Sequence, residues 1–165
     1  MTASTPRKPA GGITAAAITP AGNLLRAALG AGGRAEAGFR DGTLLTRLPL
    51  AEQRSSYTEL SDTQAGPQRV RHTLKLVVSR EAARTLFGPA FRHTAATEGL
   101  IATVTAASGE RLLIGWSARL GREQPLRLGS VSNESGVKPL DGTPVVVTLT
   151  CEDTDPAPEL KQQEP

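Results

Sequence analysis

The ten residues from 69 to 78 constrain the fold more than any other part of the chain. Apolar and polar side chains alternate there in steps of two, and the apolar set is Val70, His72, Leu74, Leu76 and Val78. Successive side chains of a β-strand point to opposite faces, so this pattern predicts a strand with one buried face. That face must pack against a second layer of structure.

Weaker strand signals surround this segment. Short apolar runs bounded by Gly, Pro or Asp-Gly turns predict further strands at residues 43–48, 57–60, 126–131 and 145–151. A loop at residues 133–144 separates the last two and is long enough to be an exposed arm.

A hairpin is predicted at residues 100–106 and 111–119, with Ser108-Gly109 as a two-residue turn. Pairing Ala107 with Glu110 places Ile101 opposite Trp116, Thr103 opposite Ile114 and Val104 opposite Leu113. Both faces of the hairpin are then partly apolar and must both be covered. One helix covers one face, so the other face requires a second sheet or another subunit.

A helix is predicted directly after the first strand. Ser79 is a suitable N-cap, and the apolar residues on one side at helical spacing are Ala82, Ala83, Leu86, Phe87 and Ala90. Pro89 is suited to opening a second helical turn, and Gly99 ends the segment.

These elements predict an α+β fold: a mainly antiparallel β-sheet, sandwich-like or barrel-like, with one helix packed on it and flexible terminal arms. A chain of 165 residues is typically one domain. We expect a flexible N-terminal arm at 1–12, a single β-rich domain at 13–152 and a flexible acidic tail at 153–165.

Composition narrows the function classes. The net charge is +3, but five acidic residues and one lysine lie between 152 and 165, which leaves the body at about +7. The arginines are scattered and aromatic residues are few, so specific nucleic-acid recognition is not indicated. The single Cys151 favours a reducing compartment, and no apolar run is long enough to predict a membrane span.

No catalytic constellation is found in the sequence. His72 lies on the apolar face of its strand, where a hydrogen-bonded core histidine is the better interpretation, and His93 has no carboxylate at ligand spacing. The glycine-rich stretch at 30–33 lacks the rest of a phosphate-binding motif, and Ser117 lies inside a predicted strand. We therefore predict neither an enzyme nor a cofactor, catalytic residue or metal site.

Eight residues are candidates for a protein interface. Trp116 is a potential anchor, although intramolecular core is the first interpretation of it. The arginines suit ion pairs between subunits, and the remaining candidates lie on the 133–144 loop. The full set is Trp116, Arg119, Arg122, Arg127, Asn133, Ser135, Gly136 and Lys138.

Several short motifs resemble a family of small proteins encoded among the tail-morphogenesis genes of tailed bacteriophages and prophages of gut bacteria. The resemblance spans residues 44–158 and leaves the first forty residues unmatched. Its motifs lie at residues 48–57, 70–76, 109–117, 125–128, 135–136, 147–150 and 153–157.

The resemblance implies a virion or tail-assembly role: a tail tube, terminator or connector-like neck subunit that forms a homo-oligomeric ring without a cofactor. Its partners would be itself and other tail or neck proteins, with DNA passing non-specifically through the ring, and it would assemble in the bacterial host cytoplasm. The alternative is a monomeric β-rich module that binds a ligand or another protein. An enzyme with an unrecognised site is a third, weaker alternative.

Overall fold

The structure is a computed structural model that describes residues 12–30, 32–40, 46–47, 55–62, 69–133 and 145–160. These ranges leave out the first eleven residues of the predicted arm at 1–12, the interface candidates Ser135, Gly136 and Lys138, and the last five residues of the predicted tail. Within them the protein is mostly antiparallel β-sheet with two short helices.

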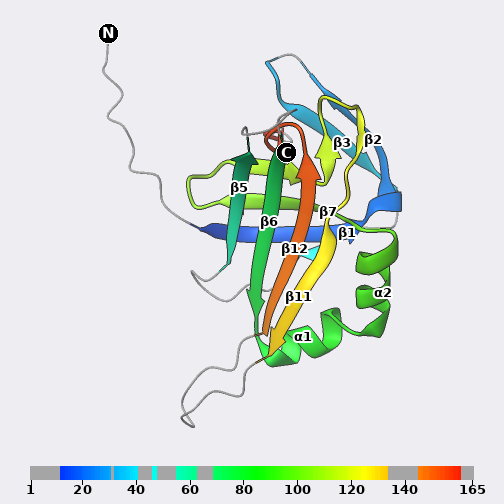
Figure 1. Cartoon of the computed structure of the whole chain (residues 1–165), viewed down its shortest axis with the longest axis vertical. Helices are drawn as coiled ribbons and strands as arrows, with labels where there is room; N and C mark the ends of the chain where they lie inside the picture. Colours follow the sequence, from blue (N-terminus) through cyan, green and yellow to red (C-terminus); the bar gives the residue numbers. More distant parts are fainter. Residues whose placement is uncertain are drawn as a thin grey trace.

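Two four-stranded sheets make up the body. The first sheet has the order β4 (Thr46–Arg47), β1 (Ile13–Pro20), β7 (Leu100–Ala106) and β8 (Arg111–Ile114). The second has the order β11 (Arg127–Asn133), β12 (Val145–Asp153), β6 (Arg69–Val78) and β5 (Ser56–Asp62). In Figure 1 the strands of the second sheet run vertically in front of β1 and β7, which run across them.

The main core lies between these two sheets. β6 contributes Leu74, Leu76 and Val78, which are fully buried as its alternating pattern predicts. The first sheet supplies facing side chains that include Ala102 and Ile114. The predicted strand at 69–78 is therefore confirmed as β6, the second-sheet strand that pairs with both β5 and β12.

A second apolar cluster covers the opposite face of the first sheet. It brings Ile101, Leu113 and Trp116 together with residues of a small hairpin, β2 (Leu24–Leu29) and β3 (Ala35–Phe39). Leu160 completes the cluster. Both faces of the β7–β8 hairpin are thus covered within one chain, and the second face does not require another subunit.

The predicted register of the β7–β8 hairpin is wrong by one residue. Ala106 pairs with Glu110, which leaves a three-residue loop that ends at Gly109 with φ 91°. A turn followed by a left-handed glycine is the common three-residue hairpin loop. Thr103 therefore lies opposite Leu113, and Ala102 lies opposite Ile114.

Gly115 divides the predicted strand at 111–119. Its φ is 103°, and β9 (Trp116–Ser117) follows directly and pairs with β10 (Arg122–Glu123). This break in the regular alternation places Trp116 in the same cluster as Leu113, while Ile114 faces the main core.

The structure has two helices where one was predicted. α1 (Arg80–Leu86) begins as expected at Ser79, whose side chain accepts a hydrogen bond from Ala82 N–H at 3.2 Å. Gly88 then interrupts the helix, and α2 (Pro89–Thr97) starts on Pro89. A proline at the first position of a helix costs no hydrogen bond, because the N–H at that position has no partner within the helix. The second helical turn predicted at Pro89 therefore forms a separate helix.

The packed body ends later than predicted. Asp153 is the last residue of β12, and residues 154–160, which we call the strap, fold back along the first sheet instead of beginning a free tail. The strand predicted at 43–48 is described only as β4, Thr46–Arg47. Among the described residues, no helix is long and apolar enough to cross a membrane.

Candidate interaction surfaces

A polar network centred on the buried His72 fixes the start of the strap. His72 in β6 is 2% exposed, and its Nε2 donates to the Asp155 carbonyl at 3.1 Å. Its Nδ1 contacts the Tyr57 hydroxyl, which also donates to Glu59 Oε1 at 2.7 Å. The same Glu59 oxygen accepts from Ala157 N–H at 3.0 Å. The prediction that His72 is a hydrogen-bonded core histidine is confirmed.

Tyr57 is a hydrogen-bonding group in this network rather than a nucleophile or base. Burial, followed by its hydrogen bond to Glu59, raises the pKa of Tyr57 well above its usual value. The hydroxyl therefore stays protonated at neutral pH and donates to Glu59. A stacked contact with the His72 ring, with centroids 5.9 Å apart, holds it in place. The network orients the strap.

Strand β5 offers a sheet edge. Among the described residues it pairs only with β6, through seven residue pairs. Leu60, near its end, is 65% exposed. An unpaired edge that carries an exposed leucine is a surface onto which another chain can add a strand.

A second exposed apolar surface lies on β2. Leu25 is 60% exposed and Leu29 is 47% exposed. Leu25 stands at the point where the register of β2 against β3 shifts, so it is not paired across the hairpin. In Figure 1, β2 and β5 lie on opposite sides of the molecule.

The described interface candidates differ in exposure and in the contacts that they make. Trp116 is 5% exposed inside the second cluster, so it is a core residue and not an exposed anchor. Arg122 is exposed in β10, and Arg119 is exposed in the turn before it. Asn133 ends β11, where its backbone pairs with Val145.

Arg127 is already engaged within the chain. Its guanidinium donates to the carbonyls of Ala96 at 3.1 Å and Thr97 at 2.6 Å. These are two of the carbonyls that the end of α2 leaves without helical partners. Arg127 therefore ties β11 to the helix and is less available to a partner.

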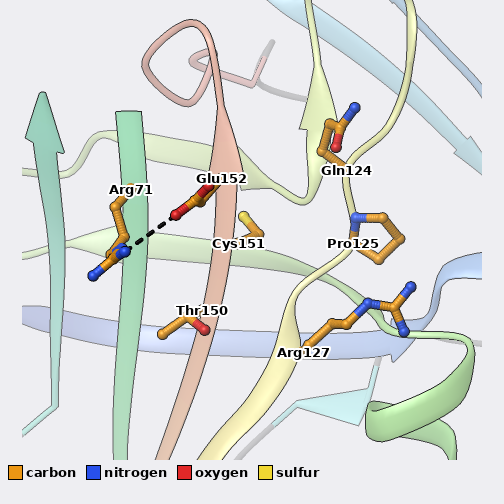
Figure 2. Close-up of a pocket in the computed structure, with 7 residues that line it drawn as sticks. All are labelled: Arg71, Gln124, Pro125, Arg127, Thr150, Cys151 and Glu152. Atoms are coloured by element: carbon orange, nitrogen blue, oxygen red, sulfur yellow. Dashed lines mark hydrogen bonds and ion pairs between the residues drawn. The ribbon is translucent and has the colours of Figure 1, made fainter. Parts of the chain in front are cut away.

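A shallow hollow of about 490 Å³ opens on the second sheet. Its lining residues, shown in Figure 2, are Arg71, Gln124, Pro125, Arg127, Thr150, Cys151 and Glu152. Arg71 and Glu152 form an exposed ion pair across it at 3.1 Å. Burial raises the pKa of the Cys151 thiol to about 12, so this thiol is not a nucleophile at neutral pH. In the described part of the chain, no group of three His, Cys, Asp or Glu residues could hold a metal ion.

Sequence reasoning missed the role of Leu60, of the Tyr57 and Glu59 pair, and of Leu160. The alternation of Tyr57 and Glu59 within a predicted strand was a usable signal, since both side chains lie on one face. Leu160 stands alone among polar and proline residues and gave no local signal.

No protein-family model, no curated protein and no solved structure matches this chain. Its function must therefore be argued from its own surfaces.

Proposed function

We propose that this protein is a structural subunit of a phage-type tail or neck, such as a tail tube, terminator or connector-like component. It would act by self-association into a ring, with a sandwich-like or barrel-like body. The observation that carries the proposal is the edge of β5, which no other described strand covers, together with the exposed Leu60. Backbone donors and acceptors on such an edge are satisfied in an assembly by a neighbouring strand.

A ring needs two different contact surfaces on each subunit, one for each neighbour. The β5 edge and β2, which carries the exposed Leu25 and Leu29, are different surfaces, and the two strands lie on opposite sides of the molecule (Figure 1). This arrangement suits head-to-tail association. The basic body, at about +7, suits a ring through which DNA passes without sequence recognition. Other tail or neck proteins would stack on the ring in the virion.

The alternative, a monomeric binding module, would use the hollow on the second sheet. Its charged groups are already committed: Arg71 pairs with Glu152, and Arg127 binds the end of α2. A ligand would have to displace these contacts. We therefore favour the assembly role.

Size-exclusion chromatography with light scattering, over a range of protein concentrations, tests the proposal. We expect a larger species at high concentration, and Leu60→Lys should shift association to higher concentration because it places a charge on the β5 edge. Leu120→Lys is the matched control, since Leu120 is an exposed leucine in the turn before β10. A chain that stays monomeric at every concentration, and with the products of neighbouring genes, contradicts the proposal.

A further inference from the structure

The strap binds between two strands as a separate peptide strand would. We call its binding site, between β8 and β3, the seat. Leu113 N–H donates to the Pro158 carbonyl at 3.0 Å, and Leu160 N–H donates to the Arg111 carbonyl at 2.8 Å. On its other side, Ala35 N–H donates to the Glu159 carbonyl at 2.7 Å. The strap thus lies between β8 and β3 and bridges the first sheet to the β2–β3 hairpin.

One side chain of the strap, Leu160, is buried in this seat. Leu160 is 8% exposed and belongs to the cluster formed by Ile101, Leu113 and Trp116. The seat therefore combines strand-like hydrogen bonds with one apolar pocket, which is how proteins that recognise extended peptides gain affinity and specificity.

The strap is bound at its start by His72 and Glu59, but along β8 it makes only a short ladder of backbone hydrogen bonds. Pro156 and Pro158 have no N–H to donate, so the ladder on β8 cannot extend toward the start of the strap. By comparison, β12 and β6 pair over nine residues. The ion pair between Arg34 and Glu159, at 3.8 Å, is exposed and adds little. Segments held in this way open locally before the rest of a domain unfolds.

We propose that the seat between β8 and β3 also accepts the strap of a second copy of this chain. The second copy carries the same segment, so every contact made by the strap is reproduced between copies and only the path of the chain just after β12, which ends at Asp153, has to change. Exchange of an identical element is a low-cost route to association because no new surface has to be made. This inference rests on the proposed function and names one contact through which copies would associate.

Trp116 is the only tryptophan of the chain and lies in the same cluster as Leu160, so its fluorescence reports whether the seat is filled. In the full chain, Leu160→Asp should empty the seat, shift the Trp116 emission to longer wavelength and increase its quenching by acrylamide. A synthetic peptide of residues 152–163 should reverse both changes. The same peptide carrying Leu160→Asp should bind at least about tenfold more weakly.

The unmodified chain provides a second measurement that does not depend on the folding of the variant. A dye-labelled peptide of residues 152–163 should bind it, as seen by fluorescence anisotropy, and an excess of unlabelled peptide should reduce self-association in size-exclusion chromatography. Absence of peptide binding to both the unmodified chain and a folded Leu160→Asp variant overturns the inference, even if the chain assembles. Peptide binding to a chain that never self-associates supports the accepting seat and contradicts the proposed ring.

Discussion

His72 and Asp155 lie 83 positions apart in the chain, yet His72 Nε2 donates a hydrogen bond to the Asp155 carbonyl at 3.1 Å. Because a carbonyl oxygen can only accept, Nε2 must carry a hydrogen. On the other side of the ring, His72 Nδ1 contacts the Tyr57 hydroxyl, which donates to Glu59. The Glu59 carboxylate lies 3.9 Å from Nδ1. The network holds the strap with side chains from β5 and β6, of which His72 is buried.

The two histidines provide a matched test of this network. His72→Leu should lower the free energy of unfolding by about 1–3 kcal/mol, because it removes the donor to the Asp155 carbonyl and one of the two polar contacts of the Tyr57 hydroxyl. His93→Leu, at an exposed position of α2, should change it by less than about 0.5 kcal/mol. Urea denaturation followed by circular dichroism measures both. Equal effects of the two variants would mean that the network does not stabilise the fold.

Because Cys151 is buried, we expect the free energy of unfolding to fall at alkaline pH. Burial, with Asp153 and Glu152 nearby, raises the pKa of its thiol from 9.0 to about 12. The folded protein therefore holds this proton more tightly than the unfolded chain, so the stabilisation is complete below pH 9 and is lost as the pH rises toward 12. Tyr57, whose pKa burial also raises, acts in the same direction.

The free energy of unfolding should be measured at several pH values between about 8 and 11. This range brackets the thiol pKa of the unfolded chain. Cys151→Ala should show a shallower decline than the unmodified protein. The same decline in both proteins would show that the thiol makes no contribution. At pH 8 we also expect iodoacetamide to modify the folded protein much more slowly than the unfolded chain.

Gly115 should tolerate no side chain. Its φ is 103°, and a Cβ there would lie 2.9 Å from both the Leu100 carbonyl oxygen and Ile101 Cδ1. Gly115→Ala should therefore cost about 2–5 kcal/mol, from backbone strain and overpacking together. Gly109→Ala is the control, because Gly109 also has a positive φ but no atom lies within 4 Å of the added Cβ. It should cost about 1 kcal/mol.

Thermal unfolding of the two glycine variants separates strain from steric conflict. If Gly115→Ala is no worse than Gly109→Ala, the close approach of β7 at Gly115 does not restrict this position. A larger loss in Gly115→Ala, together with a red shift of Trp116 emission, would show that the conflict displaces the neighbouring core.

Local patterns predicted the regular elements of the second sheet. The alternation at 69–78 corresponds to β6, and the predicted strand at 145–151 corresponds to most of β12. The Ser79 cap was also predictable, because it involves only Ser79 and the first turn of the helix that follows it. In these places the signal lies within the segment itself, so no tertiary information was needed.

The missed features depend on partners that are distant in sequence. β1, β2 and β3 are rich in alanine and show little alternation of apolar and polar residues. They are strands because β7 and the second cluster pack against them. Leu160 is buried only because the strap returns to β8. The register of β7 on β8 depends on whether the hairpin loop has two or three residues. The sequence pattern does not distinguish these two loop lengths.

Arg127 provides the last prediction, because it was a sequence-based interface candidate and the structure gives it an internal partner. Arg127→Gln removes the cation that binds the Ala96 and Thr97 carbonyls at the end of α2. We expect a loss on the order of 0.5–1 kcal/mol, since positive charge near a helix C-terminus is stabilising but this site is exposed. Amide hydrogen exchange should become faster in α2 while β6 is unchanged. Arg119→Gln, in the exposed turn before β10, is the control, and a matching effect there would leave Arg127 free for a role between subunits.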